Sequence, residues 1–344
     1  MPAAIALLAG LDAALQLMEL PTPISSTRLP DVHGPLLVLG FLGTLIALER
    51  AMALGRAVGL LAPALLGMGA LLLLTPVPLR AGQSLLVAGA ATLVAVYVPL
   101  WRRQRDHAVL VQSLGAVLAV GAAILWFGGV DVPPLLPWLV GFVVLTLAGE
   151  RLELARLAMG PRAGEVLVLL STAFSACLVA ALLWPSVGHP ALGAVVLALV
   201  GWLARHDVAR RTVHATGAPR FAAFGMLAGY AWLAVAGAVW LGGPPGGAAY
   251  DAVVHAVFLG FTMSMVMAHA PMVLPAVLRH PLPYHPAMLA PLALLHGSLV
   301  LRLWFGDALG SLPAWRTGGV LNVVAVLSFA AVAAWSATRS RSES

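Results

Sequence analysis

Long apolar runs alternate with short polar or proline-rich breaks along the whole chain. A helix needs about 20 mainly apolar residues to cross a bilayer, and twelve runs are close to that length. They cover residues 2–20, 33–53, 57–76, 82–101, 107–128, 133–156, 164–184, 190–207, 219–242, 250–275, 285–306 and 313–337. A helix in lipid satisfies its own backbone hydrogen bonds, so the pattern predicts an all-α fold, a polytopic transmembrane bundle of about 12 helices.

Three of these segments share one order of residue types. Each has a Gly-Phe pair, a polar residue nine positions after that glycine, and an aspartate nine or ten positions before it. The three sets are Asp31, Gly40-Phe41 and Glu49; Asp131, Gly141-Phe142 and Glu150; and Asp251, Gly260-Phe261 and His269. Membrane proteins often contain internal repeats. We therefore expect three pseudo-repeats of four helices, approximately residues 1–106, 107–217 and 218–344, in a single integral membrane domain, residues 1–344.

The composition agrees with a lipid environment. Of 344 residues, 61% are hydrophobic and only 9% are charged, with a mean hydropathy of +0.98, whereas a soluble domain carries about 25% charged residues. The single cysteine, Cys177, excludes a disulfide framework and a thiolate metal site. No nucleotide-binding, hydrolase or nucleic-acid motif appears. The predicted partner is therefore the lipid bilayer and not nucleic acid.

The net charge of +6 comes from arginine, because the chain contains no lysine. Fifteen arginines, Arg50 and Arg151 among them, follow even-numbered segments or lie in the C-terminal tail, and four, including Arg302, lie on the opposite side. Arginine collects on the cytoplasmic side of membrane proteins. This bias predicts a multi-pass protein of a bacterial cytoplasmic (inner) membrane with both termini in the cytoplasm.

Three histidines inside apolar segments are candidate cofactor ligands, because ionisable side chains are costly in a membrane. In the predicted topology, His33 and His255 lie near the outer ends of the second and tenth segments, and His296 lies near the middle of the eleventh. Imidazole is a common haem ligand, and bundle cores hold cofactors. We hypothesise a haem with His33 and His255 as axial ligands and His296 as a further ligand or hydrogen-bond partner. The alternative is that each packs at its helix with its nitrogens satisfied.

A second candidate site comprises Glu49, Glu150 and His269 near the inner ends of their segments. Two carboxylates and an imidazole can hold a transition metal or pass protons. Simple ion pairing is the alternative, because an arginine follows each glutamate. Four methionines surround the histidine: Met263, Met265, Met267 and Met272. Thioethers bind copper(I), although methionine more often fills a core.

Regular α-helical geometry relates these positions. His255 and His269 are 14 positions apart, which places them on nearly the same face of an α-helix, roughly 21 Å apart along its axis. His33 and Glu49 are 16 positions apart and would point about 160° away from each other. The second pair can face one axis only if its helix departs from that geometry.

The segment count, the repeats and the histidines resemble two membrane protein families. His33-Gly34-Pro35 opens the second segment, and the tenth segment carries further histidines, as in subunit I of haem-copper oxidases. The shorter NnrS family is more similar, because its His-Ala…Gly pattern resembles His255-Ala256-Val257-Phe258-Leu259-Gly260. The resemblance covers most of the chain and implies that His33 and His255 match the low-spin haem ligands. The sixth and seventh segments contain no histidine, so the oxidase copper centre does not transfer.

The resemblance implies an NnrS-like haem- and metal-binding membrane protein, linked to nitric oxide, another diatomic gas or redox chemistry. Haem would be the cofactor, with copper or another transition metal as an additional one. A proton- or ion-coupled transporter that uses Glu49, Glu150 and His269 is one alternative. A structural or assembly membrane protein without a cofactor is the other.

Overall fold

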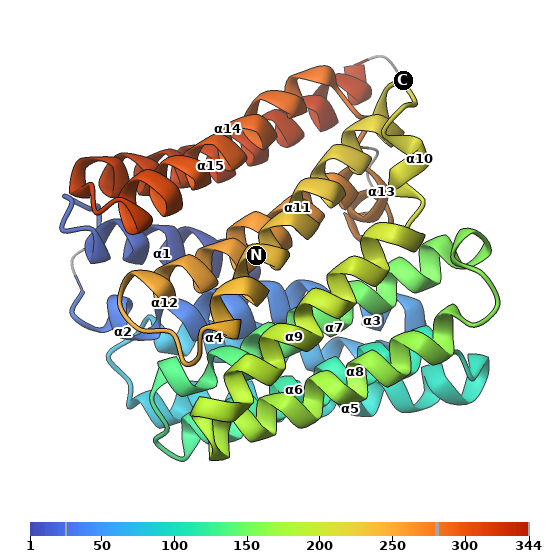
Figure 1. Cartoon of the computed structure of the whole chain (residues 1–344), viewed down its shortest axis with the longest axis horizontal. Coiled ribbons are helices and arrows are strands. Elements are labelled where there is room, and N and C mark those ends of the chain that lie inside the picture. The colour runs from blue at the N-terminus through green and yellow to red at the C-terminus, as the bar shows by residue number, and fades with distance from the viewer. Residues whose placement is uncertain (25, 279–281, 343–344) are drawn as a thin grey trace. The chain divides into compact units, whose positions relative to one another are not determined.

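The computed structural model describes residues 1–24, 26–278 and 282–342, and the regular elements of these ranges are all helices (Figure 1). Within these ranges, ten helical segments are long and apolar enough to cross a membrane. They are Arg28–Leu54, Leu79–Gln104, His107–Phe127, Val132–Arg156, Ala163–Leu183, Pro185–His206, Ala218–Leu241, Ala248–Met272, Pro286–Ala308 and Leu312–Arg339. The all-α fold predicted from the sequence is confirmed.

Two of the twelve predicted segments are shorter apolar helices, Pro2–Leu17 and Ala57–Leu73. The first has 16 residues, which rise about 24 Å, less than the hydrocarbon core of about 30 Å. It ends before Glu19, which adopts a positive φ of 58°. The second begins with one 3-10 turn, Ala57–Leu60. Each predicted segment therefore coincides with an apolar helix, but ten rather than twelve reach the length of a membrane span.

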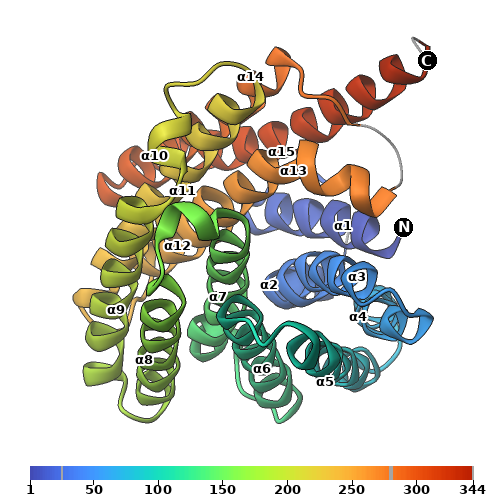
Figure 2. The same ribbon diagram turned by 90° about the vertical axis from the view of Figure 1, so that its right-hand side faces the viewer.

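The chain divides into two compact units, and the first comprises Met1–Leu154 and Arg162–Ser175. Its elements are α1 (Pro2–Leu17), α2 (Arg28–Pro35), η1 (Leu36–Leu42), α3 (Gly43–Leu54), η2 (Ala57–Leu60), α4 (Leu61–Leu73), α5 (Leu79–Gln104), α6 (His107–Phe127), most of α7 (Val132–Met159) and the first part of α8 (Ala163–Leu183). Helix α5 packs between α4 and α6, as Figure 2 shows. Helices α4 and α5 approach closely, because a Cβ on Gly69 would lie 3.0 Å from the carbonyl oxygen of Gly82.

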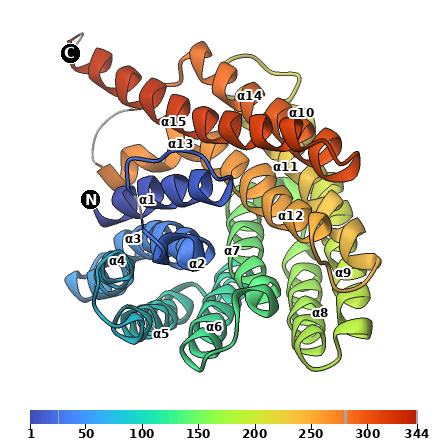
Figure 3. The same ribbon diagram turned by 90° about the vertical axis from the view of Figure 1, so that its left-hand side faces the viewer.

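The second unit comprises Ala155–Pro161 and the chain from Ala176 onward. After the end of α8, its elements are α9 (Pro185–His206), α10 (Ala209–Thr212), α11 (Ala218–Leu241), α12 (Ala248–His255), η3 (Ala256–Met263), α13 (Ser264–Leu278), η4 (Pro286–Met288), α14 (Leu289–Leu299), η5 (Val300–Ala308) and α15 (Leu312–Ser342). Helix α11 packs on α9 and on the helix formed by α12, η3 and α13. Helices α14 and α15 run side by side (Figure 3).

Three spans contain a π-helical stretch, namely η1, η3 and η5. A π-helix closes its hydrogen bonds over five residues instead of four, and such turns are frequent at functional sites. Stretch η1 lies between His33 and Glu49, and η3 lies between His255 and His269. The angular relations calculated for regular α-helices therefore do not apply directly to either pair, because a π turn holds more residues than an α turn.

The first and third Gly-Phe pairs occupy equivalent places in their spans. Gly40 lies in η1 and Gly260 lies in η3. Four residues later, the hydroxyl of Thr44 donates to the Gly40 carbonyl (2.5 Å), and that of Ser264 donates to the Gly260 carbonyl (2.6 Å). The middle pair, in contrast, lies in an α-helical part of α7. The two outer copies thus share local structure, while the division into three repeats stays a prediction.

Candidate functional site

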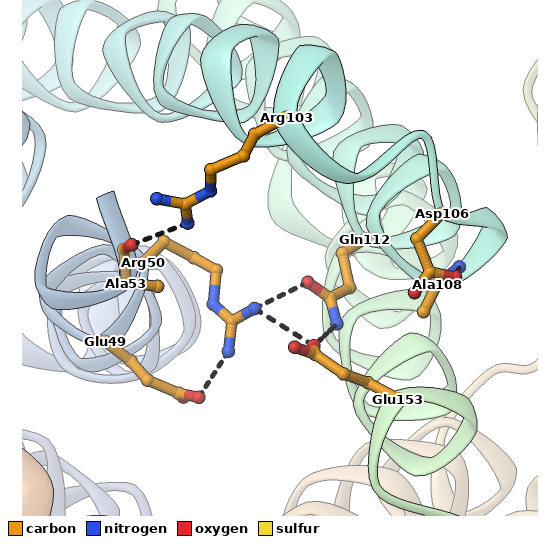
Figure 4. Close-up of polar contacts among 8 residues, drawn as sticks. All are labelled: Glu49, Arg50, Ala53, Arg103, Asp106, Ala108, Gln112 and Glu153. Carbon is orange, nitrogen blue, oxygen red and sulfur yellow. Dashed lines mark hydrogen bonds and ion pairs between the residues drawn. The ribbon is translucent and has the colours of Figure 1, made fainter. Parts of the chain in front are cut away.

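A buried arginine organises the polar side chains of the first unit. Arg50, on α3, is only 7% exposed. Its Nη1 donates to Oε1 of Gln112 (2.9 Å) and Oε2 of Glu153 (3.3 Å), and its Nη2 donates to Oε1 of Glu49 (2.5 Å). Gln112 also donates to Glu153 (3.1 Å). Figure 4 shows the guanidinium reaching from α3 toward side chains of α6 and α7, so three helices meet at one cation.

Two further side chains belong to this group. Glu150, half-buried on α7, interacts electrostatically with Glu49, Arg50 and Glu153. Tyr97, on α5, is 2% exposed and interacts with the same charged residues, but its hydroxyl has no hydrogen-bond partner among the described residues. We call the whole group the Arg50 cluster: Glu49, Arg50, Tyr97, Gln112, Glu150 and Glu153. It combines three carboxylates with one central guanidinium.

The Arg50 cluster bears on the predicted metal site. Glu49 forms the ion pair that was the alternative to metal binding. Glu49 and Glu150 lie in the first unit, whereas His269 lies in the second. Within the described ranges, no group of three or more histidine, cysteine, aspartate or glutamate side chains is arranged to hold a metal ion. What the first unit offers is a hydrogen-bonded charge network.

His269 lies on α13, where it is buried and its Nδ1 is 2.7 Å from the carbonyl oxygen of Met265. The nearby methionines differ in their surroundings. Met263, Met265 and Met267 are buried, whereas Met272 is 57% exposed. The buried methionines thus contribute to the apolar core of the second unit.

His33 and His255 lie close to the start of the π-helical stretches η1 and η3 in their respective units. Nδ1 of His33 is 2.9 Å from the carbonyl oxygen of Gly10 on α1. Nδ1 of His255 is 2.9 Å from the carbonyl oxygen of Asp251 and 3.2 Å from its Oδ1. Both imidazoles are half-buried, and each is oriented through Nδ1.

Asp251 is the centre of a second charge network. The guanidinium of Arg302, on η5, donates two hydrogen bonds to the Asp251 carboxylate, from Nε to Oδ2 (2.9 Å) and from Nη2 to Oδ1 (2.8 Å). The indole of Trp315 also donates to Oδ2 (3.2 Å) and stacks on the guanidinium at 5.0 Å. We call Asp251, His255, Arg302 and Trp315 the Asp251 cluster. Bidentate pairs of this kind are strong and geometrically specific.

His296 uses both ring nitrogens in hydrogen bonds within the second unit. Trp232 donates its indole N–H to Nδ1 (3.0 Å), and Oγ of Ser264 lies 3.4 Å from Nε2. Because Nδ1 accepts, the ring proton of a neutral imidazole is on Nε2. Gly260 allows the tryptophan to approach, since a Cβ there would lie 2.4 Å from Cγ of Trp232. Both ring nitrogens of His296 therefore have partners within the protein, as in the alternative in which the histidine packs at its helix with its nitrogens satisfied, and a role for His296 at a cofactor stays a prediction.

The role of the buried arginines was not predicted from the sequence. Arg50, Arg151 and Arg302 entered the arginine tally as residues near loops, yet they are 7%, 4% and 6% exposed. An arginine at the end of an apolar run resembles a loop residue until its partners are known. The signal was their position inside runs of membrane length, where an ionisable side chain requires a partner. Without these three, the predicted topology still places 13 arginines on one side and three on the other.

The ten apolar helices, with charged groups gathered inside each unit, define a multi-pass α-helical membrane protein. The chain belongs to the family described as Domain of unknown function (DUF8744), whose model matches residues 1–338. No curated protein and no solved structure matches the chain.

Proposed function

We propose that this chain is an NnrS-like membrane haem protein that binds or senses nitric oxide or another diatomic gas, with His255 as an iron ligand. The second ligand predicted from the sequence, His33, stays a prediction. The observation that carries the proposal is the orientation of His255. Its Nδ1 is held by the backbone carbonyl and the carboxylate of Asp251. Histidine ligands usually donate their second N–H to such groups, which leaves Nε2 to face a metal.

The surroundings of His255 fit a haem ligand. Asp251 is itself fixed by Arg302 and Trp315, so the acceptor that orients the imidazole is rigid. None of the hydrogen bonds of the described residues involves Nε2 of His255. His296 differs, because both of its nitrogens are engaged. Among these two histidines of the second unit, His255 is therefore the better ligand.

A bound haem iron would supply reversible gas binding and one-electron chemistry. The chain itself would supply the imidazole, its orientation and an apolar environment. The membrane would be a bacterial cytoplasmic membrane with both termini inside, which the excess of arginine on one side supports. An additional metal at Glu49, Glu150 and His269 stays a prediction.

The test is the absorption spectrum of the detergent-purified protein. We expect a Soret band that shifts when nitric oxide is added and that is lost in His255→Ala and weakened or lost in His33→Ala. His189→Ala is the matched control, since Nδ1 of His189 also bonds to a backbone carbonyl, that of Pro185 (3.0 Å). A folded, colourless wild-type protein, or a Soret band that survives both ligand substitutions, would refute the proposal.

A further inference from the structure

The end of α9 and the start of α11 carry exposed arginines without a counter-charge. Helices α9 and α11 pack against each other, and the short helix α10, which lies between them in the chain, contacts both (Figure 1). Four arginines of this region are exposed, and we call them the basic patch: Arg205, Arg210, Arg211 and Arg220. Among the described residues, none of the four forms an ion pair.

The single acidic residue between Trp202 and Phe224 does not neutralise the basic patch. This residue, Asp207, is only 2% exposed. Its Oδ1 accepts from the backbone N–H of Ala209 (2.9 Å), and its Oδ2 accepts from the hydroxyl of Tyr230 (2.6 Å). The carboxylate is therefore buried and bonded within the protein, whereas the guanidinium groups are at the surface. The exposed charge of this region is positive.

Aromatic side chains relate the basic patch to the edge of the bilayer. Helices α9 and α11 are both long and apolar enough to span a membrane. Trp202 is half-buried three residues before Arg205, and Phe224 is 43% exposed four residues after Arg220. Tryptophan is enriched at the boundary between apolar core and headgroups. One helical turn, about 5 Å along the axis, takes each helix from its aromatic residue to its arginine, which is the level of the lipid phosphates.

We infer that the basic patch binds the phosphodiester headgroups of anionic phospholipids. Basic segments next to membrane helices attract anionic lipids, and a guanidinium can donate two parallel hydrogen bonds to a phosphate. Nη1 of Arg210 donates to the carbonyl oxygen of Arg205 (2.7 Å), which holds this side chain beside the end of α9. That bond uses one of its five N–H groups, and the others remain for a phosphate.

A lipid fits this surface better than a soluble phosphate ester. The exposed ring of Phe224 lies beside the guanidinium of Arg220, with 5.3 Å between the guanidinium carbon and the ring centre. A ligand at this place meets a cation and an apolar surface together. A phospholipid satisfies both, because its phosphate contacts the arginine while its acyl chains cover the apolar side of the helices.

The experiment is native mass spectrometry of the full-length protein, delipidated in detergent, with added phosphatidylglycerol or phosphatidylethanolamine of the same acyl chains. We expect the wild type to bind the anionic lipid more tightly. Arg205→Gln combined with Arg211→Gln should weaken that binding by about an order of magnitude, since each arginine near an anionic headgroup contributes about fivefold, and should leave phosphatidylethanolamine unaffected. Equal affinity of the wild type for the two lipids would overturn the inference.

Two further variants separate the basic patch from net charge and from misfolding. Arg56→Gln combined with Arg102→Gln removes the same charge from exposed positions of the first unit and should leave the first bound phosphatidylglycerol in place. An equal loss in both pairs would mean that net charge alone decides. Arg205→Lys combined with Arg211→Lys keeps the charge and should keep most of the binding. A lysine variant as weak as the glutamine variant would show that local structure, not charge, was lost.

Competition by glycerol phosphate, the headgroup without acyl chains, distinguishes a lipid from a soluble ligand. At a concentration equal to that of the lipid it should not displace phosphatidylglycerol, and displacement would overturn the assignment to lipid. None of these measurements needs haem, so the inference and the proposed function can fail independently.

Discussion

Asp251 makes more hydrogen bonds with side chains than the other two aspartates of the Gly-Phe pattern, Asp31 and Asp131. Removing its charge should therefore lower the stability of the protein. Replacing it with asparagine leaves Arg302 charged, 6% exposed and without its bidentate partner. Breaking a buried ion pair in this way typically costs about 3–5 kcal/mol. We expect Asp251→Asn to lower the unfolding temperature in detergent markedly, as measured by circular dichroism.

Asp31→Asn is the matched control for that substitution. Asp31 stands at the same position relative to its Gly-Phe pair but is exposed, and substitutions at such surface positions usually change stability by less than about 0.5 kcal/mol. Equal unfolding temperatures for the two variants would contradict a structural role for the Asp251 cluster.

Single residues also mark the limit of what the sequence predicted. His33, His255, Glu49 and Glu150 were singled out because a charge or an imidazole is unusual in an apolar run. Their partners were not found, because Gln112, Tyr97 and Trp315 come from helices far away in the sequence. Polarity in a membrane segment is a local signal, whereas the pairing of two polar residues is decided by tertiary packing.

At the scale of elements, the close packing of η3 against α11 depends on a glycine. A Cβ on Gly260 would lie 2.4 Å from Cγ and 2.5 Å from Cβ of Trp232, and the base of that side chain cannot move without its helix. Overpacking of this kind costs typically about 1–3 kcal/mol. Gly260→Ala should therefore destabilise the protein and weaken the bond between Trp232 and His296, which a change in tryptophan fluorescence would report.

Gly297→Ala provides the comparison for Gly260→Ala. Gly297 also lies inside a membrane helix, but nothing is within 4 Å of the position where its Cβ would be. Alanine is a better helix former than glycine by about 1 kcal/mol, so this variant should be as stable as the wild type or slightly more. If both variants lose the same stability, helix propensity rather than packing would be responsible.

A second prediction at this scale concerns Gln112, which is fully buried and joins α6 to Arg50 of α3 and Glu153 of α7. Gln112→Leu keeps the volume but removes both hydrogen bonds. Leaving buried polar partners unsatisfied costs about 1–3 kcal/mol, so the midpoint of thermal unfolding should fall. Ser113→Ala, at a half-buried position whose hydroxyl bonds only within its own helix, should leave it unchanged.

The elements themselves were predictable to different degrees. The lengths of the spans follow from the thickness of the bilayer, which is why each apolar run coincides with a helix. The π-helical stretches were not predicted, because an apolar run specifies burial in lipid but does not determine how many residues each turn contains. Two of these stretches include a Gly-Phe pair, whereas the third, Val300–Ala308, does not. A Gly-Phe pair in the sequence therefore does not identify every π-helical stretch.

At the scale of the whole molecule, the distribution of arginine predicts the orientation of every span, and cysteine labelling tests it. Gln104 and Asp131 are exposed and lie beyond opposite ends of α6. In a Cys177→Ala background, which removes the native thiol, a membrane-impermeant maleimide should label Asp131→Cys in intact cells. It should label Gln104→Cys only after the membrane is permeabilised. The reverse pattern would place the arginine-rich loops outside, and labelling of both sites in intact cells would mean that α6 does not cross the bilayer.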